Sequence, residues 1–193
     1  KVKREFEKMI AMKKTLLFSC LFTFVTLLSI GSAKAQDFKD LDESPHDIVY
    51  FRTNKIAPPS IKVLYGRPMK KGRDLFEEVI PYGQIWRVGA NEATEVVFYK
   101  NVLFGGTEVK AGTYVLYAIP NEKEWTLILS SKTDVWGTYE YDDKYDVARV
   151  QAKVSRAEFI EAFSIAFKEK GKHINMVLGW DTARVTAPIR FDI

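Results

Sequence analysis

The chain has 193 residues, a formal net charge of +4 and a single cysteine, Cys20. The basic excess comes from the first 35 residues, because residues 36–193 hold 22 basic and 23 acidic side chains. This balance excludes nucleic acid as a partner, which would require a clustered positive charge. Since residues 36–193 contain no cysteine, a disulfide framework and a thiol nucleophile are excluded there too.

The beginning of the chain predicts an export signal. Residues 1–11 precede a credible start at Met12, so we expect them to be an upstream extension outside the fold. An uncharged, largely apolar run at 15–30 is followed by Ala-Lys-Ala at 33–35, a pattern typical of a signal peptidase site. We therefore expect residues 12–35 to be a cleaved signal peptide and the rest to act outside the cytoplasm, in the periplasm, with no stable membrane span. A retained anchor is the alternative, disfavoured because the run is shorter than the ~20 residues a membrane helix needs.

The next segments predict strands. We expect residues 36–55 to form a loose polar leading segment ahead of a folded domain at 56–193. From Ile61 onward, apolar side chains recur at every second position, which is typical of strands. The runs at 113–119 and 125–129 are apolar on both faces, so we expect these strands to be covered on each side.

The later strands are expected to be one-sided. Ala148, Val150 and Ala152 face one way in the run at 147–154, with polar or charged side chains between them. Residues 160–168 also alternate as a strand, and a helix beginning near Arg156 is the alternative. One short helical turn is expected at residues 74–78.

Taken together, the elements predict an all-β fold. Short strands separated by turns, without a long amphipathic helix after the leader, are typical of sandwiches and barrels. No linker divides residues 56–193, so they form one domain. We expect a single-domain antiparallel two-sheet β-sandwich, jelly-roll-like, with at most one or two short helical turns.

Five sequence blocks carry a resemblance to a known family. They are Ile-Ala-Pro-Pro-Ser at 56–60, Tyr-Gly-Arg-Pro at 65–68, Pro-Tyr-Gly-Gln-Ile-Trp-Arg-Val-Gly-Ala-Asn-Glu-Ala-Thr at 81–94, Ala-Gly-Thr-Tyr at 111–114 and Trp-Gly-Thr-Tyr at 136–139. From about residue 56 to residue 193, the chain resembles the secreted proteins of Bacteroidetes-type bacteria known as domain of unknown function 2911. The resemblance implies an exported domain, and it supplies neither an activity nor catalytic residues.

Several patterns expected of enzymes are missing from the sequence. The two histidines, His46 and His173, lie far apart, which disfavours a zinc site. We interpret His173 as a surface residue at a strand edge rather than a general base. No G-x-S-x-G, S-x-x-K or phosphate-binding glycine loop occurs. The sequence indicates no cofactor and leans away from catalysis.

The first candidate site is a polar group formed by Arg87, Asn91 and Glu92. The group precedes the strand expected at Thr94, so it lies near one end of the sheet, where binding loops are common. Arg87 suits a carboxylate or phosphate, and Glu92 suits an acid or base role. The alternative is structural: an Arg87–Glu92 ion pair, with Asn91 in a left-handed turn and Trp86 in the core.

The second candidate is the long loop at 136–146. Trp136 and Tyr139 predict an exposed aromatic platform suited to sugars or extended ligands, and a lid folded over the rim of the core is the alternative. Acidic side chains in this loop are weak candidates for calcium ligands, although they lack an EF-hand pattern. These acids are Asp142, Asp143 and Asp146.

Two further sets of charged residues are candidates for binding or catalysis. One is a basic hairpin whose side chains either clamp an anion or are solvated at a tip: Arg67, Lys70, Lys71 and Arg73. The other is a carboxylate pair, Glu92 with Asp181, which suits glycoside hydrolysis if the two lie ~5–10 Å apart.

These observations favour a non-catalytic ligand-binding module in the cell envelope. The expected ligand is a sugar or a small anion, and the expected contacts are Arg87, Asn91, Trp136 and Tyr139. Two alternatives stay open: a glycosidase-like hydrolase using Glu92 and Asp181, and a structural partner for proteins in envelope assembly.

Overall fold

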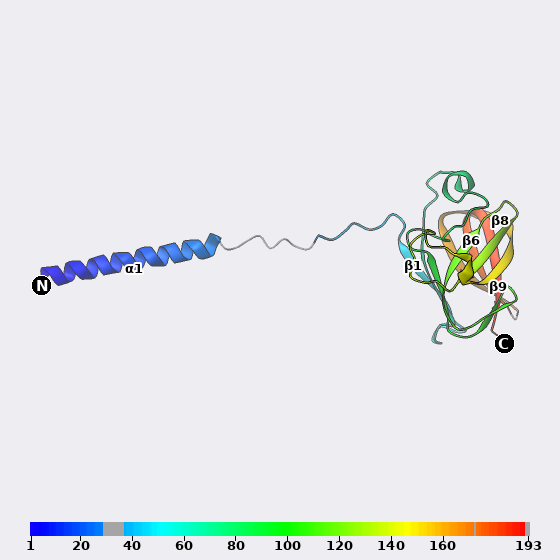
Figure 1. The fold of residues 1–193 in the computed structure, drawn as a ribbon, viewed down its shortest axis with the longest axis horizontal. Helices are drawn as coiled ribbons and strands as arrows, with labels where there is room; N and C mark the ends of the chain where they lie inside the picture. The colour runs from blue at the N-terminus through cyan, green and yellow to red at the C-terminus, as the bar shows by residue number, and fades with distance from the viewer. Residues whose placement is uncertain (29–36, 172, 192–193) are drawn as a thin grey trace. The chain divides into compact units, whose positions relative to one another are not determined.

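Strands are the main regular structure of the chain, because apolar side chains alternate with polar ones over long stretches. The computed structural model describes residues 1–28, 37–171 and 173–191. It divides into two units, Lys1–Asp40 and Leu41–Ile193. The all-β prediction is confirmed for the second unit, which holds every strand (Figure 1).

The first unit contains a helix, α1 (Val2–Leu28), which includes the expected upstream extension and part of the expected signal peptide. The predicted cleavage site at residues 33–35 lies outside the described residues. Among the residues that are described, no helix combines the length and apolar character needed to cross a membrane. Export therefore stays a prediction.

The second unit is built from antiparallel strands that form one sheet. In chain order they are β1 (His46–Phe51), β2 (Ile61–Gly66), β3 (Thr94–Phe98), β4 (Val102–Phe104), β5 (Thr107–Val109), β6 (Gly112–Ile119), β7 (Glu124–Ser130), β8 (Asp146–Lys170) and β9 (His173–Arg190). Their order across the sheet is β1-β2-β3-β6-β7-β8-β9-β4-β5. Two short helical turns interrupt the strands, η1 (Leu75–Val79) and η2 (Asp143–Tyr145).

Strand β8 makes the sheet continuous. Its first half pairs with β7 and its second half pairs with β9, with register shifts after Arg156 and Ile160. The strand prediction at residues 160–168 is therefore confirmed, and the helical alternative is wrong. Met69, which follows β2, bridges Ala162 of β8, so the sheet curls until its first strands meet β8. The expected division into two separate sheets is not confirmed, because the hydrogen-bonded ladder runs through all nine strands.

Two local elements show how sequence determines structure. Strand β1 lies within the expected polar leading segment, where Val49 and Phe51 alternate with exposed neighbours and Phe51 is buried. The polar leading segment was therefore predicted too long. The helical turn expected at residues 74–78 is confirmed, and the Asp74 side chain caps it by accepting hydrogen bonds from the next turn.

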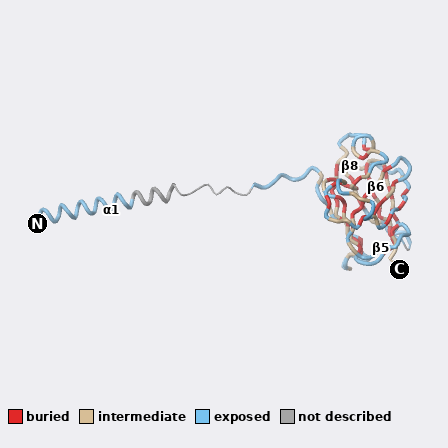
Figure 2. The backbone as a smooth tube through the Cα atoms, viewed as in Figure 1, coloured by how far each residue is buried: buried red, intermediate tan, exposed pale blue. Residues whose placement is uncertain are grey.

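Buried residues gather in the strand unit (Figure 2), and the core occupies both faces of the central strands, as expected. On one face of β6 and β7, Leu116 and Leu127 join the main cluster, which contains the aromatic rings Trp86, Trp125, Phe163 and Trp180. The other face carries a smaller cluster, which includes Val115, Tyr117, Ile128 and Val135. The one-sided pattern of the first half of β8 is also confirmed, since Ala148, Val150 and Ala152 are buried.

The smaller cluster predicts a loss of stability at alkaline pH. Tyr117 is buried and packs edge-on against Tyr141, with ring centroids 5.0 Å apart, and burial raises the pKa of both hydroxyls to about 12. The folded state therefore keeps protons that the unfolded state loses above pH ~10, so stability falls between pH ~10 and ~12. The ionisation of Tyr117 accounts for about 2–3 kcal/mol of this loss in the free energy of unfolding.

Urea unfolding followed by tryptophan fluorescence at pH 9, 11 and 12 measures this loss. Tyr117→Phe is expected to flatten the alkaline decline, because phenylalanine carries no proton. An equally steep decline in that variant would contradict the assignment.

Candidate functional site

A strained turn at residues 87–92 carries the first candidate group. Trp86 and Ala118 exchange backbone hydrogen bonds of 2.7 and 2.9 Å, which attach the start of the turn to β6. Val88 and Asn91 both have positive φ, at 55° and 62°. The Thr94 hydroxyl donates a 2.6 Å hydrogen bond to the carbonyl of Val88 and holds the turn closed. The left-handed Asn91 and the buried Trp86, expected on the structural interpretation, are both confirmed.

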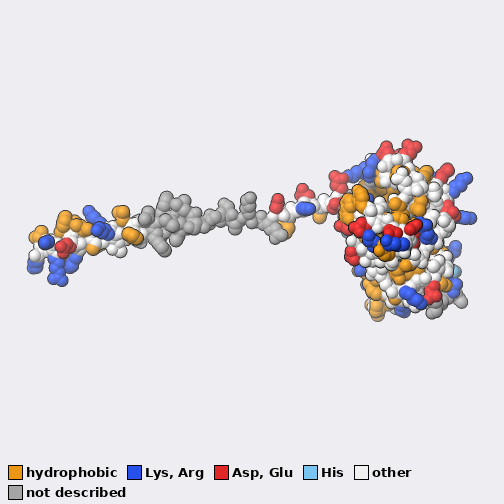
Figure 3. All heavy atoms as spheres, viewed as in Figure 1, with side chains coloured by type: hydrophobic (Ala, Val, Ile, Leu, Met, Phe, Trp, Pro, Cys, Tyr) orange, Lys and Arg blue, Asp and Glu red, His pale blue; other side chains and the backbone are white. Residues whose placement is uncertain are grey.

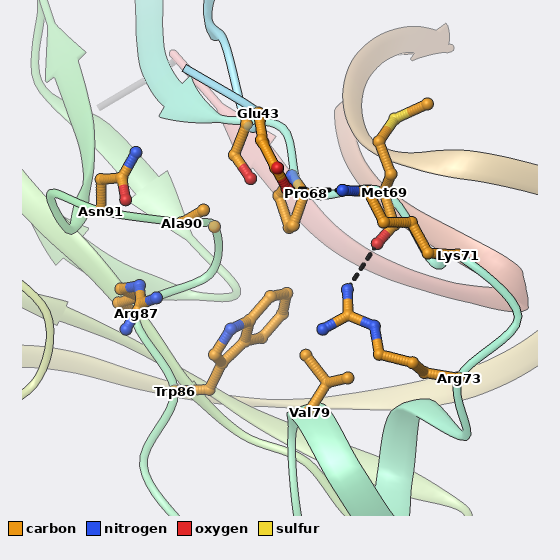
Figure 4. Close-up of a pocket in the computed structure, with 12 residues that line it drawn as sticks. Glu43, Pro68, Met69, Lys71, Arg73, Val79, Trp86, Arg87, Ala90 and Asn91 are labelled. Carbon is orange, nitrogen blue, oxygen red and sulfur yellow. Dashed lines mark hydrogen bonds and ion pairs between the residues drawn. The ribbon is translucent and has the colours of Figure 1, made fainter.

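Beside this turn lies a cavity of about 460 Å³, here called the Arg87 pocket (Figure 4). Trp86 and Val79 supply apolar lining, and Figure 4 shows Arg73 and Arg87 on either side of the indole. Its polar residues come from three separate segments of the chain: Glu43 and Ser44, Lys71 and Arg73, and Arg87 with Asn91.

The pocket holds more positive than negative charge. Lys71 Nζ lies 2.5 Å from Glu43 Oε2, which leaves Arg73 and Arg87 without a carboxylate partner among the described residues. The Arg73 guanidinium donates to the carbonyls of Met69 and Lys70 at 2.7 and 3.0 Å. Arg87 Nε is buried and has no hydrogen-bond partner in the part of the chain that is described. The lining therefore combines three cations with one carboxylate.

This positive charge is local. Figure 3 shows basic and acidic side chains interspersed on the visible face of the strand unit. The segment before β1 reaches the pocket, since Glu43 and Ser44 line it. Asp42 accepts a 2.7 Å hydrogen bond from the Ser44 backbone N–H, and hydrogen bonds from Ser44 and from the Asn91 side chain hold the pKa of Asp42 below its usual range. Sequence reasoning missed Glu43 and Ser44, which lie in a polar stretch that shows no periodic pattern.

The four basic side chains of the hairpin have two different roles: two of them bind other parts of the fold, and two line the Arg87 pocket. Arg67 donates to the Phe163 carbonyl at 3.1 Å, to Asp47 at 3.0 Å and to Ser164 at 2.8 Å, so it joins β8 to the first strands. Lys70 Nζ pairs with Asp181 Oδ2 at 3.1 Å. Lys71 and Arg73 alone of the four line the Arg87 pocket.

Glu92 does not pair with Arg87, so the expected ion pair is wrong. Glu92 Oε2 lies 3.0 Å from His46 Nε2, and both side chains line a second cavity of about 530 Å³. Asn91 lines the Arg87 pocket and Glu92 lines the second cavity, although the two residues are adjacent in sequence. The backbone turns sharply between them, because Asn91 has a positive φ. Asp181 pairs with Lys70 and lines neither cavity, so the structure does not bring the carboxylate pair together.

Trp136 and Tyr139 form an exposed stack, here called the aromatic stack. Their rings lie 5.6 Å apart at an interplanar angle of 6°, and 53% of Trp136 and 82% of Tyr139 is exposed. The expected platform is present, and the alternative of a lid folded over the core is wrong. The Arg87 guanidinium carbon lies 5.9 Å from the centre of the Trp136 ring.

The loop acids serve local structure. Asp142 caps η2 and pairs with Lys144 at 2.6 Å, which lowers its pKa. Asp146 accepts a hydrogen bond from the Tyr141 hydroxyl at 2.9 Å and pairs with Arg149, and burial raises its pKa. Within the described residues, no group of three or more His, Cys, Asp or Glu side chains could hold a metal ion, so Asp142, Asp143 and Asp146 do not form a calcium site. His173 is exposed at the start of β9.

Comparison with known proteins gives one match. A family model described as "Protein of unknown function (DUF2911)" matches residues 44–189, a range that includes the Arg87 pocket apart from Glu43 and also the aromatic stack. No curated protein and no solved structure matches the chain.

Proposed function

The chain belongs to the DUF2911 family, and from the geometry of the Arg87 pocket we propose that its strand unit is a non-catalytic domain that binds a small anion. We further propose that it acts in the cell envelope. The support for that location is the basic, apolar and small-residue pattern of residues 12–35.

The observation that carries the proposal is the charge of the pocket lining. Arg73 and Arg87 line the pocket without a carboxylate partner among the described residues, while Lys71 pairs with Glu43. An oxyanion in the pocket would be attracted by both arginines, because hydrogen bonds between a guanidinium and an oxyanion are charge-assisted and strong. A ligand of this charge therefore balances the positive charge of the lining.

The same geometry supports binding more than catalysis. Glu43 is the carboxylate of the pocket, and it is paired with Lys71. Glu92 and Asp181, the acids that a glycosidase mechanism would need, have separate partners, His46 and Lys70. The geometry therefore gives no support to a hydrolase that uses Glu92 with Asp181. The other alternative, a structural role in envelope assembly, differs from the proposal in its expected result, because it predicts no stabilisation by small anions.

We expect small anions to raise the melting temperature of the domain. Phosphate, sulfate, acetate and succinate are compared at constant ionic strength by thermal shift. At a tenfold excess over Kd, the bound anion is expected to add about 3–6 °C. Arg73→Gln and Arg87→Gln are each expected to weaken binding by about tenfold or more, since each removes a charged donor.

Lys110→Gln is the matched control, because Lys110 is exposed, pairs with Glu108 and does not line the pocket. Its anion affinity is expected to equal that of the unmodified chain. The proposal fails if no anion stabilises the protein, or if the Lys110 variant loses as much affinity as the two arginine variants.

A further inference from the structure

The aromatic stack lies directly beside the Arg87 pocket. The Gly137 N–H donates a 3.1 Å hydrogen bond to the carbonyl of Asn91, and Glu92 and Trp136 form a β-bridge. Arg87 belongs to both features, since it lines the pocket and lies against the Trp136 ring. The cationic pocket and the exposed rings are thus held together by paired backbone segments.

Gly137 allows the stack to form. Its φ is 65°, and a Cβ atom at this position would lie 3.2 Å from the Tyr139 ring. The rings stack on each other in solvent, where most of the Tyr139 side chain stays exposed. Exposed aromatic faces with polar tips suit a ligand that is apolar on one face and hydroxylated at its edge.

The second cavity, whose lining has three carboxylates and His46 beside apolar residues, borders Trp136 of the stack. Trp136 lines it together with Glu92, Glu95 and Asp134. Ionised carboxylates accept hydrogen bonds and donate none, so hydroxyl groups are suitable partners for them. Asn91 lines the Arg87 pocket and Glu92 lines this cavity, so the turn between them presents two environments of opposite charge.

We propose that the ligand is an acidic saccharide. Its carboxylate or sulfate binds in the Arg87 pocket, one sugar ring lies on the aromatic stack, and ring hydroxyls donate to the carboxylates of the second cavity. The inference rests on the proposed function, because it requires the Arg87 pocket to bind an anion. A neutral sugar would leave Arg73 and Arg87 without a negatively charged partner. A simple anion would make no contact with the aromatic stack. A nucleotide also combines an anionic group, a flat ring and ribose hydroxyls, so AMP is included among the probes as the competing ligand class.

Calorimetric titration of the full chain tests the ligand class. The probes are tetramers of galacturonate and of mannuronate, a sulfated galactose tetramer, the methyl-esterified galacturonate tetramer, acetate, sulfate and AMP. At least one acidic tetramer is expected to bind about tenfold or more tightly than acetate or sulfate, and the esterified tetramer is expected to bind more weakly than its acid. Trp136→Ala is expected to remove that tenfold gain and to weaken the binding of acetate and sulfate much less, since Arg87 keeps its charge when it loses the contact with the Trp136 ring.

Tyr99→Ala is the matched control, because Tyr99 is an exposed aromatic residue that lines neither cavity. It is expected to bind every probe as the unmodified chain does. If simple anions bind through Arg73 but no acidic tetramer binds more tightly, or Trp136→Ala has no effect, the saccharide inference is wrong and the proposed function stands. If AMP binds more tightly than every tetramer, the ligand class is wrong. If no anion binds at all, both proposals fail.

Discussion

Gly66→Ala is expected to destabilise the strand unit by about 3 kcal/mol or more. A Cβ atom on Gly66 would lie 2.3 Å from the carbonyl oxygen of Ala90, and a Cβ atom on Gly89 would lie 3.0 Å from the carbonyl oxygen of Gly66. The end of β2 and the strained turn therefore approach backbone to backbone. Because the obstacle is backbone and not a mobile side chain, the turn must move, and Asn91 moves with it away from the Arg87 pocket.

Gly106→Ala separates this contact from the ordinary cost of replacing a glycine. Gly106 has a φ of 98° and open space where a Cβ would lie, so its substitution is expected to cost about 1 kcal/mol. Urea unfolding of both variants gives the two free energies. Equal losses would mean that Gly66 does not pack against the turn as described. Gly66→Ala is also expected to weaken anion binding, while Gly106→Ala leaves it unchanged.

Much of the fold follows from local sequence. Apolar side chains at every second position predict strands with one buried face. Runs that are apolar on both faces, such as 113–119, predict strands that are covered on both sides. Asp74 predicts a helical start because its carboxylate accepts from the next turn. These features depend on neighbours within a few residues, so the sequence alone is sufficient to predict them.

Other features depend on distant parts of the chain. Strand β1 is short and flanked by polar residues, and it is stabilised by pairing with β2. The exchange of partners along β8 leaves no mark on its alternating pattern, so one long strand and two short ones cannot be told apart in the sequence. Two sheets were therefore predicted from the sequence, whereas the structure has one sheet that continues through β8.

The candidate site was only partly predicted, because it too depends on contacts between distant parts of the chain. Arg87, Asn91, Trp136 and Tyr139 were identified because polar and aromatic side chains gather in connecting segments, where binding residues are common, and the structure places these segments next to each other. The pairing of Arg87 with Glu92 was wrong because closeness in sequence does not determine direction when Val88 and Asn91 both have positive φ. The contribution of Glu43 requires the segment before β1 to reach the pocket, and no local pattern predicts that contact.

Trp86→Ala is expected to destabilise the strand unit by about 3–5 kcal/mol, which lowers the melting temperature by about 10 °C or more. The Trp86 ring lies 5.1 Å from Phe163, 5.8 Å from Trp125 and 6.1 Å from Trp180, measured between ring centroids. It is 7% exposed and lines the Arg87 pocket. Removing the ring therefore opens the main core toward the pocket and removes its apolar wall.

Trp136→Ala is the matched control, because it removes the same side chain from an exposed position. Its cost is expected to stay below about 1 kcal/mol, the scale of a single exposed aromatic contact. Unfolding in urea, followed by circular dichroism so that neither tryptophan is needed as a probe, compares the two variants. Trp86→Phe should recover most of the lost stability, since it keeps an aromatic ring against Phe163 and Trp180. If Trp86→Ala were as mild as Trp136→Ala, the indole would not be part of the core, and the Arg87 pocket would lack the rigid wall on which its binding role depends.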